Sequence, residues 1–515
     1  MDHKVIVPLE AVLSEAIDLP VGCVPTPSAA YRIHRKTLQT TIQPGRPRLT
    51  DGLAPASVLA RAPGPAPAPV PVPQASGSRV LMWKQDPTVT ELGVRGSYLP
   101  GMILAGPRDA RIASGMPGIA PVSPNVFGDF IVSPNTDQFD AIHTFAIVRQ
   151  TLTMYQRVLA AGPTPAPLPW QWNSASNTDP LKVYPHGLPN VMNAYYSRSD
   201  KALKFGDFLP NGGNDRVYTC RSLDIVSHET GHAVLDGLKP RWLLSSNPPQ
   251  TGGLHESFGD LTAIFLTLSQ LDQVEALIAQ TKANLHDKNF LADMAEQFGL
   301  ALGRPNGLRN ADNDLTLSDT GNEVHAISQV FTGAIYDILA DIFAFERRSA
   351  LFDDAAVLHR VAEYLRGLVL RALIGAPDFG ATFADVANQM LHIASTDGKP
   401  QDYLSFIRNR FTVRQVLTGQ ALNLSGNGHA GAEVMLQPGY QDEPDAVQDR
   451  RTCCGTMNNG EYFDADGLLD LEREQLANWC RDYHYGNGHD VTAPAIPLAA
   501  TLTGKTSATP APAIP

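Results

Sequence analysis

Two histidines four positions apart mark the most chemically informative part of the chain. They are His228 and His232, and Glu229 directly follows the first of them. Residues four apart on a helix project from one face, so both imidazoles can reach a single cation. Zinc is the usual ion for nitrogen ligands around an open coordination position, and a neighbouring carboxylate can take a proton from a water bound there. We therefore expect two zinc ligands, a general base at Glu229 and peptidase chemistry, against the alternative of a solvated polar helix face.

Apolar residues on both sides of this pentapeptide predict a partly buried helix. Leu223 and Val226 precede it, and Val234 and Leu235 follow it, at the spacing of one helix face. Gly231 lies between the histidines and costs helix stability by about 1 kcal/mol relative to alanine. We expect that this loss is tolerated because another group approaches closely there.

A third protein ligand is expected from the next predicted helix. Glu256 lies on that helix, and Asp260 follows it by one turn on the same face. Asp260 could accept the free ring N–H of a ligating histidine and so fix its tautomer. His255 is the competing candidate, but it faces a different direction from Glu256 on the helix, and we favour Glu256 as the ligand.

Composition and charge limit the class of protein. The 515 residues are 43% hydrophobic and 18% charged, as in ordinary globular proteins. A net charge of -12 argues against nucleic acid or an anionic membrane as the main partner. We find no apolar run of the roughly twenty residues that a membrane span needs. The first residues lack the pattern of a signal peptide, which favours the cytoplasm.

Local composition and hydrophobic patterning divide the chain into five segments. Residues 1–52 have no assignable role, and 53–79 read as a Pro/Ala-rich linker of extended polyproline type. Residues 80–240 are expected to be β-rich and to end in the helix with the two histidines. A helical region with the third ligand is expected over 241–418, and 419–515 are expected to form a partly disordered extension.

Hydrophobic periodicity predicts most of the helices. One begins near Thr136, and the others cover 223–238, 254–272, 325–346, 355–374, 383–394 and 400–417. The five cysteines are too few and too irregularly spaced for a disulfide framework. One local disulfide between Cys480 and either Cys453 or Cys454 stays open as an alternative to free thiols.

The sequence over roughly 95–418 resembles the thermolysin-like (gluzincin) zinc metallopeptidases. That family carries His-Glu-x-x-His on one helix and, on the next, a glutamate with an aspartate four residues later, as at Glu256 and Asp260 here. The resemblance implies an α+β fold with a thermolysin-like two-lobed catalytic unit. Its β-rich N-terminal lobe contains the zinc-site helix, and its C-terminal lobe is all-α, with irregular extensions at both ends.

Further motifs assign roles by the same resemblance. Asn193-Ala194-Tyr195-Tyr196 is similar to the family's edge-strand segment, so Asn193 and Ala194 are expected to bind the substrate backbone. Asn322-Glu323-Val324-His325 resembles the element whose histidine stabilises the oxyanion, which makes His325 catalytic, with Asp319 expected to orient its ring. Arg309 resembles the arginine that grips a substrate carbonyl.

Three departures from the family pattern accompany these assignments. The family has a tyrosine eleven residues after the second histidine, where this chain has Leu243. Asp224 matches an acid that helps to bind calcium in the family, but the companion position is Thr267, which argues against a double calcium site. Family members are usually exported with a signal peptide and a propeptide, so compartment stays open between cytoplasm and export.

The predicted mechanism is zinc-assisted hydrolysis of a peptide bond by an endopeptidase. His228, His232 and Glu256 would hold zinc, and Glu229 would act as general base and then protonate the leaving amine. The main alternative is a catalytically weak or inactive protein that uses the peptidase fold to bind peptides, for which Leu243 is the motive. A zinc hydrolase of non-peptide amides is a third alternative, disfavoured by the peptide-aligning Asn193 and Ala194.

Overall fold

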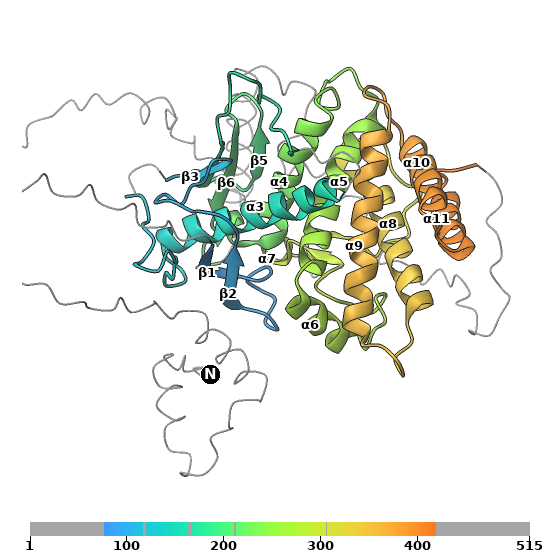
Figure 1. Cartoon of the computed structure of the whole chain (residues 1–515), viewed down its shortest axis with the longest axis horizontal. Helices are drawn as coiled ribbons and strands as arrows, with labels where there is room; N and C mark the ends of the chain where they lie inside the picture. Colours follow the sequence, from blue (N-terminus) through green and yellow to red (C-terminus); the bar gives the residue numbers. More distant parts are fainter. Residues whose placement is uncertain (1–76, 117–119, 162–166, 211–212, 305, 419–515) are drawn as a thin grey trace, which may run out of the picture. The chain divides into compact units, whose positions relative to one another are not determined.

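A computed structural model describes residues 77–116, 120–161, 167–210, 213–304 and 306–418 (Figure 1). All of these residues belong to one compact unit. The first predicted segment, most of the predicted linker, and the extension with Cys453, Cys454 and Cys480 lie outside the described residues. The strand β1 begins at Ser78, within the last residues assigned to the linker.

The first half of the described chain is built on short strands. β1 (Ser78–Trp83) and β2 (Val94–Leu99) form an antiparallel pair. A five-stranded mixed sheet has the order β3-β4-β6-β5, and β7 pairs with the end of β6. Its strands are β3 (Ile112–Ser114), β4 (Leu181–Leu188), β5 (Ala194–Ser197), β6 (Ala202–Phe208) and β7 (Val217–Tyr218). β5 therefore ends the sheet and pairs, among the described strands, with β6 alone.

A long helix packs on this sheet. α3 (Asp137–Ala160) begins where Thr136 caps it, because the Thr136 side chain accepts a hydrogen bond from the amide of Phe139. Asp137 and Asp140 in its first turn suit the positive end of the helix dipole. The helix start predicted near Thr136 is confirmed. Figure 1 shows α3 crossing between the sheet and the helices of the second half.

The second half is helical, as periodicity predicted. Its helices are α4 (Leu223–Leu238), α5 (Pro249–Leu268), α6 (Leu271–Thr281), α7 (Glu296–Ala301), α8 (Val324–Glu346), α9 (Asp354–Gly375), α10 (Phe383–Thr396) and α11 (Gln401–Val413). A two-stranded pair, β8 (Asp293–Met294) with β9 (Arg309–Asn310), lies among them in sequence. The predicted helix 254–272 was misplaced: α5 begins at Pro249 and ends before Ser269, after which α6 bends away by 93°.

The close crossing of α4 and α5 depends on two glycines. A Cβ atom at Gly231 would lie 2.7 Å from Oγ1 of Thr262, and one at Gly259 would lie 2.6 Å from the ring of His228. A Cβ atom essentially never lies that close to another heavy atom, so a larger residue at either position would force the helices or the contacting side chain to move. The predicted close approach at Gly231 is confirmed, and it brings the histidines of α4 against the carboxylates of α5.

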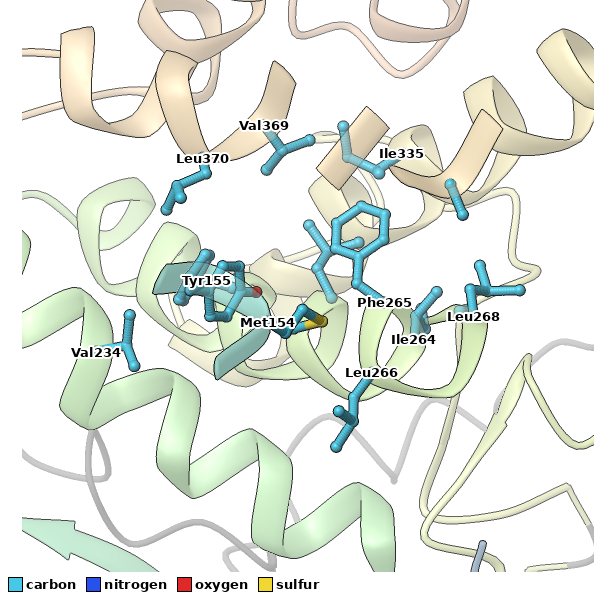
Figure 2. Packing of buried hydrophobic residues seen from close by; sticks show 14 of the residues in the cluster. Met154, Tyr155, Val234, Ile264, Phe265, Leu266, Leu268, Ile335, Val369 and Leu370 are labelled. Atoms are coloured by element: carbon cyan, nitrogen blue, oxygen red, sulfur yellow. The ribbon is translucent and has the colours of Figure 1, made fainter. Parts of the chain in front are cut away.

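A continuous hydrophobic core joins the two halves. Figure 2 shows side chains from α3, α4, α5, α8 and α9 meeting around Phe265. Within this core the Tyr155 hydroxyl lies 2.8 Å from Oγ1 of Thr262, so its polar end is satisfied. The fold is thus α+β, as predicted, with its helices packed around the central α5.

One described helix is long and apolar enough to cross a membrane by length and composition. It is α8, and 89% of its most apolar window is buried inside the protein. A buried core helix of a soluble protein passes the same criteria, so α8 is weak support for a membrane span.

Candidate metal centre

The two histidines and Glu256 meet at the crossing of α4 and α5. His228, His232 and Glu256 are almost completely buried. One ligand atom from each lies within 4.8 Å of the others. The ring centroids of His228 and His232 are 4.7 Å apart and nearly perpendicular, as expected for residues one helical turn apart that converge on one point. The sequence therefore identified a group of side chains that the fold brings together.

The spacing of the candidate ligand atoms fits a tetrahedral ion. Nε2 of His228 lies 3.4 Å from Oε2 of Glu256, and Nε2 of His232 lies 3.6 Å from Oε1 of the same carboxylate. Ligands on a tetrahedral zinc with bonds near 2.05 Å are separated by about 3.3 Å. Nε2 of His228 is buried and has no hydrogen-bond partner among the described residues, which is what a metal-ligating lone pair requires.

The charge of the site also suits a dication. The carboxylates of Glu229, Glu256 and Asp260 are buried at the site, and the guanidinium of Arg309 is the charged group that faces Asp260. Burial by itself lowers the pKa of His228, but its contacts with Asp260 and Glu256 outweigh burial and raise that pKa to about 10. The buried carboxylates around His228 therefore favour positive charge in the site, which a zinc ion would supply.

Asp260 holds the ring of His228 as predicted. Its Oδ1 lies 2.9 Å from Nδ1 of His228, which leaves Nε2 directed toward Glu256. The same oxygen accepts a hydrogen bond of 2.6 Å from Nη2 of Arg309, in β9. Burial opposes ionisation of Asp260, yet Arg309 and His228 lower its pKa to about 2, so it stays a carboxylate. Arg309 therefore lies beside the candidate metal ligands, where it contacts the carboxylate that orients one of them.

His325 enters the site from the first turn of α8. Its Nε2 is 3.4 Å from Oε2 of Glu256, and it is buried without a hydrogen-bond partner among the described residues. The position of His325 beside the ligand carboxylate fits the catalytic role expected of it. A donor at Nε2 could reach charge that develops on the substrate next to the metal.

The residue that orients His325 is Glu323, which corrects the prediction for Asp319. Nδ1 of His325 lies 2.6 Å from Oε1 of Glu323, whose other oxygen caps α8 by accepting from the amide of Ala326. Asp319 is exposed and its carboxylate accepts from Thr316 within its own loop. Burial opposes ionisation of Glu323, but His325 lowers its pKa to about 2. Glu323 is a helix N-cap two residues before His325, a signal that the sequence contained.

His255 is absent from the group of candidate ligands and contacts one of them instead. Its Nδ1 lies 2.7 Å from Nδ1 of His232, and the two rings are 4.9 Å apart. The preference for Glu256 over His255 agrees with this geometry. The contact with His232 was not anticipated, because it depends on the crossing of α4 and α5 rather than on spacing within one helix.

The candidate substrate residues Asn193 and Ala194 lie at the end of the sheet. Ala194 opens β5, which also packs against α4. Asn193 is buried, and its Oδ1 accepts a hydrogen bond from the amide of Ala194. An end strand offers backbone groups to which an extended peptide can pair, so the location suits the predicted role, which stays a prediction.

Residue 243, where the thermolysin-like pattern leads one to expect a tyrosine, offers no hydrogen-bond donor to the candidate site. Leu243 is buried in the core, and the neighbouring Trp242 uses its Nε1 to donate to the carbonyl of Pro377. His325 is accordingly the described residue that best fits oxyanion stabilisation.

A small pocket opens beside His228 that the sequence did not define. It is mostly apolar, and its lining comes from α4, from Asp260, and from the strands β8 and β9 with their flanks. The lining residues are Asp224, Ile225, His228, Asp260, Met294, Ala295, Leu308 and Arg309. Of the three candidate ligands, the pocket touches His228, and it also touches Asp260 and Arg309, which support that histidine.

Asp224 lies in a group of buried acids at the back of this pocket. Its Oδ2 accepts from the amide of Ala295, and Asp86 accepts from the amide of Gln297 close by. Burial raises the pKa of Asp224 well above its usual range, and Asp86 reinforces the shift. Thr267 stands where a double calcium site would need a second acid. Its hydroxyl accepts a hydrogen bond from the side-chain amide of Gln85.

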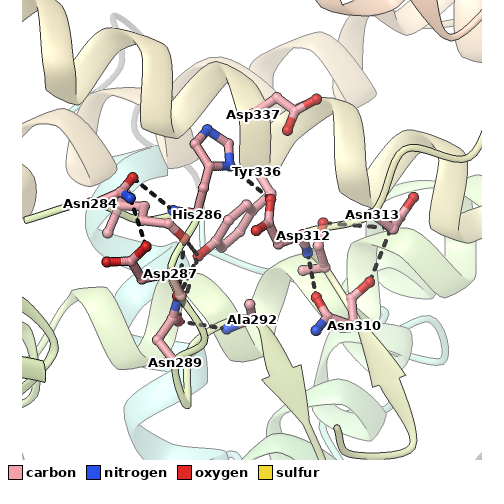
Figure 3. A network of polar contacts seen from close by, with 12 residues as sticks. Asn284, His286, Asp287, Asn289, Ala292, Asn310, Asp312, Asn313, Tyr336 and Asp337 are labelled. Carbon is pink, nitrogen blue, oxygen red and sulfur yellow. Dashed lines mark hydrogen bonds and ion pairs between the residues drawn. The ribbon is translucent and has the colours of Figure 1, made fainter. Parts of the chain in front are cut away.

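Two other clusters have metal-ligand types, but cationic side chains already engage them. In one, His286 contacts Asp312 at 2.8 Å, as Figure 3 shows. Asp337 of the same cluster pairs with Arg414 at 2.9 Å. In the other, Asp140 contacts Arg221 and His186. These arginines compensate the carboxylates, so both clusters are better explained as structural networks.

Comparison with models of known protein families gives no match for this chain, and a search among curated proteins gives none either. The assignment of a function therefore depends on the side chains described above.

Proposed function

We propose that this protein is a zinc-dependent endopeptidase with a thermolysin-like two-lobed fold. One observation carries the proposal: His228, His232 and Glu256 form a buried group with the spacing of tetrahedral zinc ligands, and Glu229 is buried directly beside the first of them. Three protein ligands with an open position are typical of catalytic zinc, whereas structural zinc usually has four. The remaining side chains fit hydrolysis of an amide.

Each residue has a defined task in this proposal. Zinc, when bound, supplies a Lewis acid that polarises the scissile carbonyl and acidifies a water. Glu229 accepts the proton of that water and then donates it to the nitrogen of the leaving amine. His325, held by Glu323, donates from Nε2 to the negative charge that develops on the carbonyl oxygen.

The substrate is proposed to be an extended peptide. Its backbone pairs with the segment at Asn193 and Ala194, since β5 ends the sheet and packs on the helix that carries the ligands. Arg309 is proposed to donate to a carbonyl near the cleaved bond. Ile225, Met294 and Leu308 line the adjoining pocket, so we propose that an apolar side chain next to the cleaved bond is preferred.

A weakly active or peptide-binding protein is the second candidate. The observation that favours it is the missing donor, because Leu243 is buried in the core and Trp242 donates to Pro377. Loss of one oxyanion donor costs about 3 kcal/mol of transition-state stabilisation. The buried Glu229 favours the enzyme, since a binding module has no use for a carboxylate held at such cost beside the ligands.

Cleavage of an unstructured protein by the full-length chain tests the proposal. Casein is incubated with zinc-loaded wild type, with wild type after removal of metal by a chelator, and with zinc-loaded Glu229→Gln. We expect cleavage by wild type, its loss on chelation and recovery on addition of zinc. Glu229→Gln is expected to be at least about 100-fold slower. Cleavage that persists in Glu229→Gln at full rate would exclude Glu229 as the base.

A further inference from the structure

His232 is supported by a different kind of group from its fellow ligand. Asp260, a carboxylate, contacts Nδ1 of His228, whereas the imidazole of His255 contacts Nδ1 of His232 at 2.7 Å. Both rings of the second pair are completely buried, and they are inclined by only 32°. The outer support of a ligating histidine is most often a carboxylate, a backbone carbonyl or a water. The imidazole of His255 takes the place of these usual partners.

The short contact fixes where the protons lie. Two nitrogens 2.7 Å apart can share only one proton, so one Nδ1 donates and the other accepts. Nε2 of His232 faces Glu256 at 3.6 Å and is the atom available to a metal, so the proton of His232 lies on Nδ1. His255 then accepts at Nδ1 and retains its own proton at Nε2.

The rest of the surroundings agree with this arrangement. Nε2 of His255 is buried and has no hydrogen-bond partner among the described residues, so the ring makes its polar contact with His232 alone in that part of the chain. A buried N–H without an acceptor is unfavourable. The hydrogen bond to His232 therefore explains the orientation of the His255 ring, because that orientation leaves the other nitrogen of His255 without a partner among the described residues.

We propose that His255 is a positioning residue that holds His232 in the tautomer and orientation needed for zinc, through the hydrogen bond from Nδ1 of His232 to Nδ1 of His255. His255 accepts this hydrogen bond as a neutral ring. It therefore orients His232 without adding a further negative charge beside Glu229 and Glu256. The two histidine ligands thus differ: an anion supports His228, and a neutral ring supports His232. This inference rests on the proposed zinc site, but not on peptidase activity.

Zinc affinity of the full-length protein tests the inference independently of catalysis. Zinc binding to the metal-free chain is measured by competition with a chromophoric chelator for wild type, His255→Leu, His255→Asn and His255→Gln. His255→Leu removes the acceptor and is expected to weaken zinc binding about 10- to 100-fold. An amide oxygen can accept the same N–H, so at least one amide variant is expected to bind within about threefold of wild type.

Controls separate positioning from misfolding and from failure of the proposed function. His392→Leu, at an exposed position of α10, is expected to bind zinc as wild type does. Circular dichroism of each metal-free variant checks that the fold is intact. Wild-type affinity in His255→Leu, or equal loss in the leucine and both amide variants, would overturn the inference. Tight zinc binding by wild type without casein cleavage would instead contradict the proposed function and leave the role of His255 standing.

Discussion

At the scale of single residues, Glu323 links the start of a helix to the chemistry of the site. One of its oxygens caps α8 and the other contacts Nδ1 of His325 at 2.6 Å. The cap fixes the carboxylate, and the carboxylate fixes the ring, so Nε2 of His325 stays directed at Glu256. An N-cap that also orients a catalytic side chain positions it without a second supporting element.

The first prediction concerns this carboxylate. Glu323→Gln is expected to lower kcat about tenfold with little change in KM, because the donor it orients acts on charge that develops in the transition state. Steady-state kinetics on a quenched peptide measures the effect. Asp319→Asn is the matched control and should leave kcat unchanged, because Asp319 contacts Thr316 and not His325. A larger loss in Asp319→Asn than in Glu323→Gln would reverse the assignment.

At the scale of elements, the approach of α4 to α5 determines whether the ligands can meet. Gly259 is the tightest point, since its missing side chain leaves room for the ring of His228. The two histidines come from α4 and Glu256 comes from α5, so the distances from Glu256 to the histidines depend on this packing more than on either helix alone.

Gly259→Ala is therefore expected to impair metal binding as well as stability. The added Cβ would lie 2.6 Å from the His228 ring, so the ring or the helix must move. We expect destabilisation by about 1–3 kcal/mol and substoichiometric zinc. Gly367→Ala in α9 is the control: its Cβ would be 3.8 Å from the nearest atom, and it should be neutral or stabilising by up to ~1 kcal/mol. Denaturant unfolding and zinc analysis of both variants measure this; full zinc occupancy in Gly259→Ala would contradict the packing account.

The acids behind the pocket predict how stability depends on pH. Asp224, in α4, has a folded-state pKa raised above its unfolded value, chiefly by burial. The native protein then binds more protons at this group than the unfolded chain does, so the free energy of unfolding falls as pH rises above about 4. Asp224→Asn removes this titration. Its Tm relative to wild type is expected to improve by about 3 °C or more between pH 5 and pH 8.

Thermal melting of the metal-free proteins at the two pH values measures the difference. Asp354→Asn, in the first turn of α9, serves as a control, because its carboxylate is partly exposed and paired with Arg347. A Tm difference between Asp224→Asn and wild type that stays the same at pH 5 and pH 8 would show that Asp224 titrates alike in folded and unfolded chains.

At the scale of the whole molecule, the candidate metal site lies within the common core of the described residues. α5 carries Glu256 and Asp260 and packs against α4 on one side and α8 on the other, as Figures 1 and 2 show. An ion bound to α4 and α5 would thus link a helix that packs against the sheet, α4, to a helix that packs against α8, α5. Zinc should therefore contribute to global stability.

Metal removal is expected to lower the melting temperature. A ligand at 1,000 times its dissociation constant stabilises the native state by about 4 kcal/mol, so chelation should lower Tm by about 5 °C or more. Calorimetry with and without chelator measures the change. Glu256→Gln removes the negative charge of one candidate ligand, so its Tm should change much less on chelation. An equal change in Tm in both proteins would show that the stabilising ion binds elsewhere.

The sequence predicted what depends on local periodicity. The bounds of α4, the ligand triad and Asp260 follow from residues one helical turn apart, and the fold brings them together as expected. The roles of Glu323 and His255 were missed for different reasons. The first depends on the geometry of a helix N-cap, and the second on which residues face each other across two crossing helices. The pocket could not be predicted either, since it is formed by segments far apart in the chain.

The most direct test of the central claim is the rate of peptide cleavage by the full-length protein at known zinc occupancy. Wild type and Glu229→Gln are each loaded to one zinc per chain and assayed on the same internally quenched peptide with an apolar residue after the cleaved bond. We expect cleavage by wild type and a rate at least about 100-fold lower for Glu229→Gln at equal zinc content. Equal rates, or no cleavage by wild type with zinc fully bound, would contradict it.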